Sequence, residues 1–97
     1  MTTAREAEAA MLSRCSLVAR EAAPLAEDSR EANVFRLAAM VVRSRFPGES
    51  ARLMQASERY FASHPNDRLD AVDVVRQGWV VSLPRLRDML SHQLSGH

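Results

Sequence analysis

The stretch that decides the fold is NVFRLAAMVVRSRF, from Asn33 to Phe46, which is the most apolar run in the chain. Its apolar residues occupy most of the circumference of a helix, and Arg36, Arg43, Ser44 and Arg45 interrupt them. A helix that is apolar nearly all round is central to its domain rather than peripheral. The sequence therefore predicts a central helix here, with the other helices packed around it.

Both ends of the central helix carry boundary signals. Asp28 and Glu31 have the spacing of a capping box, in which the Asp accepts from an early backbone N–H and the Glu reaches back. At the far end, Pro47 excludes the α region for Phe46, so the helix stops there. The connection to the next helix is short, and we therefore expect these two helices to be antiparallel neighbours.

An N-terminal helix is predicted from Ala4 to Ala22, with Thr3 and Glu6 as its capping box and Pro24 beyond its end. Apolar residues recur at three- and four-residue steps along one stripe: Ala4, Ala7, Met11, Cys15, Val18 and Ala22. Small residues in this stripe allow another helix to approach closely. That helix belongs either to the same bundle or to a second copy of the chain.

Three further helices are predicted after the central one. The first begins near Glu49 and ends at residues 64–65, where the sequence reads His-Pro. The next is capped by Asn66 or Asp67 and has Gly78 as its C-cap. Residues 79–81 are then either an extended joint or a continuation of the same helix past a tolerated Gly. The last begins with Ser82 as its N-cap and Pro84 in its first turn, where no donor is needed. The prediction is an all-α fold: a single domain, residues 1–97, forming a small helical bundle of four to five helices.

Composition bounds the class of protein. All thirteen basic residues are Arg, and the absence of Lys and Ile indicates a GC-rich, bacterial gene. The only cysteine, Cys15, has no partner for an internal disulfide, which is typical of a reducing compartment. The N-terminus lacks the pattern of a secretory signal, and no apolar run is long enough to span a membrane. We therefore expect a cytoplasmic protein without a membrane partner.

Patterns typical of catalysis are missing from the sequence. It contains no Gly-rich phosphate loop, nucleophile elbow, HExxH sequence or paired-cysteine metal motif. His64 ends a helix, where an imidazolium suits the helix dipole, and His92 and His97 lack further metal ligands nearby. Cys15 lies on an apolar stripe, where a buried thiol is unreactive. We therefore expect a protein that is not an enzyme and has no catalytic residue, metal ligand or cofactor.

Protein binding is the function that we predict from the sequence: a small adaptor, chaperone, inhibitor or regulator of a larger bacterial protein, with a homodimer as a further option. The one Trp is followed by two Val at a helix joint, and Trp is enriched at binding hot spots. Packed inward, the same Trp would plug the end of the bundle. The predicted contact residues are Trp79, Val80, Val81 and Leu83, with Arg43, Arg45 and Arg52 providing electrostatic orientation.

Two further interpretations stay open. Methionines such as Met40, Met54 and Met89 form either an adaptable contact surface or core filler. Residues 33–66 carry five Arg and two Glu, a net charge of +3. Their Arg residues, in the central helix and the one after it, either contact phosphates or form a solvated face. The alternative function is therefore a DNA-associated regulator that binds through these Arg residues.

Overall fold

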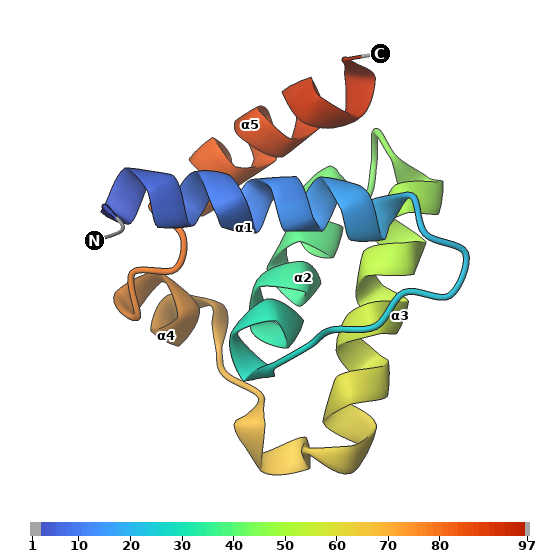
Figure 1. Ribbon diagram of the computed structural model, residues 1–97, viewed down its shortest axis with the longest axis vertical. Helices are drawn as coiled ribbons and strands as arrows, with labels where there is room; N and C mark the ends of the chain where they lie inside the picture. The colour runs from blue at the N-terminus through green and yellow to red at the C-terminus, as the bar shows by residue number, and fades with distance from the viewer. Residues whose placement is uncertain (1–2, 97) are drawn as a thin grey trace.

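Five α-helices and one short 3₁₀ helix make up the computed structural model, which describes residues 3–96 (Figure 1). Within that range there is no β-strand, so the predicted all-α bundle is confirmed. None of its helices combines the length and the apolarity that crossing a membrane requires. The helices are α1 (Ala4–Ala19), α2 (Ser29–Val42), α3 (Pro47–Ser63), η1 (Pro65–Asp67), α4 (Ala71–Arg76) and α5 (Leu83–Ser95).

The central position predicted for α2 is confirmed. Its side chains Val34, Phe35 and Leu37 are buried, and they join one hydrophobic core to which the other α-helices also contribute. α2 and α3 lie side by side and antiparallel, α1 crosses both of them, and α5 packs beside α1 and against α2 (Figure 1). Four neighbouring elements thus surround α2, which is why its sequence is apolar on most sides.

Helix starts follow the predicted caps closely. The side chains of Thr3 and Ser82 accept hydrogen bonds from backbone N–H groups three residues on, at 3.1 Å and 3.2 Å. Asp28 Oδ1 accepts from the backbone N–H of Glu31 at 2.8 Å. The carboxylate of Glu31 reaches back to the N–H of Glu27 at 3.1 Å, one residue before the helix cap itself. Local side-chain oxygens therefore accept from open donors at the starts of α1, α2 and α5, whereas α3 and α4 begin without a side-chain cap.

α1 ends at Ala19, three residues before the predicted end. The N–H groups of Arg20 and Glu21 bond to carbonyls three residues back, which tightens the last turn. The guanidinium of Arg52, on α3, donates to the carbonyl of Ala19 at 3.1 Å. A side chain from α3 thus provides a donor for a carbonyl at the end of α1, and α1 ends before the predicted residue.

α4 begins at Ala71 rather than at residues 66–67. The buried side chain of Asn33 donates to the carbonyl of Asp67 at 3.0 Å and accepts from the N–H of Leu69 at 2.9 Å. These two bonds hold residues 67–69 outside any α-helix, so only the short η1 turn forms before them. The predicted end is confirmed, because Gly78 adopts a φ of +81° just beyond the helix.

Candidate protein-binding surfaces

The joint between α4 and α5 holds the apolar residues that we predicted as protein contacts. Val81 is 61% exposed, whereas Trp79 and Leu83 are half-buried. Val80 is only 4% exposed and belongs to the core. The prediction of Val80 as a contact residue therefore needs correction, because its side chain packs into the core while its neighbour Val81 faces solvent. Trp79, Val81 and Leu83 remain accessible at this joint.

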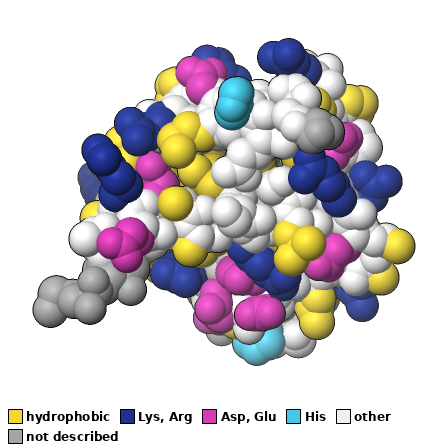
Figure 2. Space-filling view, turned by 45° about the horizontal axis from the view of Figure 1, so that its top comes forward, with side chains coloured by type: hydrophobic (Ala, Val, Ile, Leu, Met, Phe, Trp, Pro, Cys, Tyr) yellow, Lys and Arg dark blue, Asp and Glu magenta, His cyan; other side chains and the backbone are white. Residues whose placement is uncertain are grey.

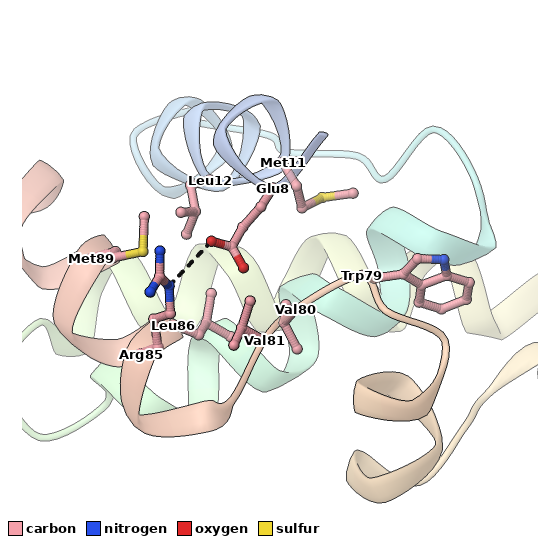
Figure 3. A pocket seen from close by; sticks show the side chains of 9 residues that line it. All are labelled: Glu8, Met11, Leu12, Trp79, Val80, Val81, Arg85, Leu86 and Met89. Atoms are coloured by element: carbon pink, nitrogen blue, oxygen red, sulfur yellow. Dashed lines mark hydrogen bonds and ion pairs between the residues drawn. The ribbon is translucent and has the colours of Figure 1, made fainter. Parts of the chain in front are cut away.

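A small apolar hollow lies where the joint meets α1 and the start of α5 (Figure 3). Met11 and Leu12 of α1 and Met89 of α5 contribute to its lining. Arg85 Nε forms an ion pair with Glu8 Oε1 at 3.3 Å beside it, and the Glu8 side chain is only 13% exposed. The hollow therefore lies between α1 and α5, which the Arg85–Glu8 ion pair also joins. Trp79 is partly buried against the core, so it packs the joint as well as contributing exposed surface.

A second apolar surface lies between α2 and α3, away from the joint between α4 and α5. Met40 is 54% exposed, in the last turn of α2, and Met54 of α3 is half-buried beside it. We call this surface the α2–α3 groove. The residues that define it are Ala39 and Met40 of α2, Arg43 just beyond the end of α2, and Pro47, Ser50, Ala51 and Met54 of α3.

The groove continues along the outer face of α3. Ala51 and Met54 also line a neighbouring hollow, whose other residues include Glu58 and Ala62. The sequence left Met40 and Met54 open as either an adaptable contact surface or core filler, and neither was among the predicted contact residues. The signal that could have found this surface is the three-residue step from Met40 to Arg43, since residues at that spacing share one helix face.

Three arginines of the basic central region bond within the protein. Arg52 donates to the carbonyl of Ala19, and Arg59 donates to the carbonyl of Pro24 at 3.2 Å. Arg36 donates to the carbonyl of Leu69, and burial, followed by the nearby charge of Arg68, lowers the pKa of Arg36. These bonds join α2 and α3 to distant segments of the chain.

The seven residues predicted as one contact site lie in three places. Arg43 lines the α2–α3 groove, and Arg52 lies on the adjoining face of α3. Arg45 lines a polar cleft between the end of α2 and the second half of α5, together with Arg87 and His92. The apolar joint lies at the start of α5 instead. The structure therefore does not bring the predicted arginines and the predicted apolar anchors together.

Reactive groups do not gather in any of these surfaces. Within residues 3–96, no three His, Cys, Asp or Glu side chains are close enough to hold a metal ion. Cys15 is fully buried, and this burial, together with the nearby Glu31 carboxylate, raises the pKa of its thiol to about 12. A thiol with such a pKa stays protonated at neutral pH and is a poor nucleophile. What the surfaces offer is apolar contact and positive charge.

Comparison with known proteins yields no relative of this chain: no family model, no curated protein and no solved structure matches it.

Proposed function

We propose that this protein is a non-enzymatic binding module of the bacterial cytoplasm, an adaptor, chaperone, inhibitor or regulator that docks another protein in the α2–α3 groove. The observation that carries the proposal is that Met40 is 54% exposed and lies beside Met54, Pro47 and Ala51. Contiguous apolar surface at a groove is typical of protein interaction sites. Methionine suits such a surface, because its unbranched thioether adapts to different partner shapes.

The cytoplasmic part of the proposal is supported by the state of the cysteine. Cys15 is a free thiol in the core of the domain. Free, unpaired cysteines are typical of reducing compartments. A fractionation of the native host should therefore recover the protein with the cytoplasm.

The experiment that tests binding is affinity capture from a nuclease-treated lysate of the native host, with partners identified by mass spectrometry. Wild-type protein is compared with Met40→Glu, which places a charge in the groove. Leu17→Glu is the matched control, because Leu17 is 55% exposed on α1 and lies outside the groove. Circular dichroism verifies that both variants fold.

The expected result is a nuclease-resistant partner that is captured by the wild-type protein and by Leu17→Glu but not by folded Met40→Glu. Retention of every partner by Met40→Glu would show that the groove is not the docking site. In that case Trp79→Ala and Val81→Glu test the joint between α4 and α5 in the same way.

The alternative is a DNA-associated regulator that uses the Arg residues of α2 and α3. Arg43, Arg45, Arg52 and Arg59 are exposed and support it, whereas Arg36 is half-buried and donates to the carbonyl of Leu69. On the face shown in Figure 2, basic side chains lie at several separate places, with hydrophobic and acidic ones between them. Binding to generic duplex DNA should, on this alternative, weaken steeply between about 50 and 200 mM salt. No binding at low salt would remove the alternative.

A further inference from the structure

We propose that the occupant of the α2–α3 groove is an amphipathic helix of another protein whose apolar stripe is flanked by acidic side chains. This inference rests on the proposed protein-binding function and specifies the chemistry of the partner. It follows from the shape of the groove, the backbone groups around it and the charges along its edges.

The floor is continuous and has the length of a helix: it is mostly apolar from Pro47 to Met54, and it is mixed beyond, where Gln55, Glu58 and Arg59 accompany Ala62. Because Ala51 and Met54 line both hollows, the floor runs along α3 from Pro47 to Ala62. At 1.5 Å per residue this is about 22 Å, or about four helical turns. An amphipathic helix of about 16 residues would cover the whole floor with residues at i, i+3, i+4 and i+7 spacing.

The groove offers side chains rather than backbone groups to its occupant. Both of its walls are α-helices, whose N–H and C=O groups bond along the helix itself. A peptide that binds by adding a strand needs a sheet edge, and residues 3–96 contain no sheet. A helix satisfies its backbone internally, so it can bind here through its side chains alone.

Three arginine side chains line the groove and its continuation. Arg43 lines the groove, and Arg52 and Arg59 line its continuation on α3. Within residues 3–96, none of these three forms an ion pair with a carboxylate, and Glu58 is the acidic residue that lines this face. Complementary charge on a partner is therefore acidic.

Two of these guanidinium groups are held in place before any partner binds. Arg52 and Arg59 each use one nitrogen to donate to a backbone carbonyl, of Ala19 and of Pro24. A guanidinium has five N–H donors, so each retains donors for a carboxylate. Side chains fixed in this way lose less conformational entropy when they bind a partner.

The test uses two synthetic peptides of about 16 residues with the same leucine stripe, one flanked by Glu and the other by Lys. Binding is measured by fluorescence anisotropy. We expect the Glu peptide to bind about tenfold or more tightly than the Lys peptide, and its affinity to fall as salt screens the charges. Met40→Glu should weaken it strongly. Arg43→Glu should weaken the Glu peptide several-fold and leave the Lys peptide unaffected or tighter.

The matched control for charge is Arg30→Glu, because Arg30 is also an exposed arginine of α2 but does not line the groove. This variant should bind the Glu peptide as the wild-type protein does. Equal binding of the two peptides, or equal effects of Arg30→Glu and Arg43→Glu, would overturn the acidic-helix assignment.

The remaining outcomes separate this inference from the proposed function. If neither peptide binds although the captured partner still depends on Met40, protein binding in the groove stands and the acidic helix is wrong. If neither peptide binds and capture is also independent of Met40, both the proposed docking in the groove and the acidic-helix inference are wrong. A second copy of this chain is the remaining possible occupant of the groove, and sedimentation equilibrium of the protein alone tests it. A dimer that Met40→Glu dissociates would place the second copy in the groove and overturn the assignment to another protein.

Discussion

The side-chain carbonyl of Asn33 accepts a hydrogen bond from the backbone N–H of Leu69 at 2.9 Å, which ties the start of α2 to the segment that leads into α4. The amide nitrogen of Asn33 donates at the same time to the carbonyls of Ser29 and Asp67, at 2.9 Å and 3.0 Å. Because Asn33 is fully buried, its side chain makes all of these hydrogen bonds inside the protein.

We therefore expect Asn33→Ala to lower the free energy of unfolding by about 2–4 kcal/mol, since it removes three hydrogen bonds at once. Urea denaturation measures this loss. Gln55→Ala, at an exposed position of α3, is the control and should change stability little. A loss for Asn33→Ala as small as that of the control would contradict the role assigned to Asn33.

Arg14 and Glu31 join α1 to the start of α2. Arg14 Nε lies 3.2 Å from Glu31 Oε1, and their side chains are 23% and 10% exposed. Arg14 also donates to the carbonyl of Leu25, and Glu31 accepts from the N–H of Glu27. A double-mutant cycle with Arg14→Ala and Glu31→Ala should give a coupling energy of about 1 kcal/mol or more.

The matched control for that cycle is the pair Arg87 and Asp88, whose nitrogen and oxygen are 3.1 Å apart but whose side chains are 54% and 70% exposed. Water screens such a pair, so its cycle should show little coupling. Equal coupling in the two cycles would mean that burial does not strengthen the Arg14–Glu31 pair.

Gly78 and Gly48 should respond to alanine in opposite directions. Gly78 has a φ of +81°, and an added Cβ would meet no atom within 4 Å, so the effect of Gly78→Ala comes from the backbone alone. We expect a loss of about 1–2 kcal/mol, and a smaller loss for Gly78→Asn, because Asn visits the left-handed region more readily.

Gly48 lies in the first turn of α3, where an added Cβ would lie 3.8 Å from Arg52 Nη1, an ordinary contact. Gly48→Ala should therefore stabilise the protein, by about 0.4–1 kcal/mol. Thermal denaturation of the two variants, side by side, measures both effects. Destabilisation of the same size in both would contradict the conformational difference between the two glycines.

Cys15 should make stability depend on pH in the alkaline range. Burial, followed by the Glu31 carboxylate, raises the pKa of its thiol from 9.0 to about 12, so in this range the unfolded chain releases its proton before the folded one does. The contribution of the protonated Cys15 thiol to the free energy of unfolding is complete below about pH 9. It is lost between about pH 9 and 12, at about 1.4 kcal/mol per pH unit.

The measurement for Cys15 is urea denaturation of the wild-type protein and Cys15→Ala at several pH values from about 8 to 10.5. The difference in stability between the two proteins should shrink as pH rises. Tyr60, whose pKa is also raised, is present in both proteins and cancels from the difference. A constant difference would show that the thiol titrates alike in the folded and unfolded states.

Local chemistry of the sequence determined most of the fold by itself. The caps at Thr3, Asp28 and Ser82 and the positive φ of Gly78 lie where the sequence predicts them. The predicted end of α2 at Phe46 is wrong, because a turn already follows Val42, and α3 begins at Pro47, two residues before the predicted Glu49. Each of these signals acts between residues at most four positions apart, so neighbouring residues are enough to read it. The apolar character of residues 33–46 likewise indicated which helix would be central.

Tertiary structure alone decided where the surfaces lie. The partners of Asn33 and Arg52 are 36 and 33 residues away, and they set the start of α4 and the end of α1. The same packing buries Val80 and leaves Met40 at the surface, although both are apolar residues next to other apolar residues. Exposure depends on which neighbouring helix covers a given face, and that is a property of the packed helices rather than of any stretch of sequence.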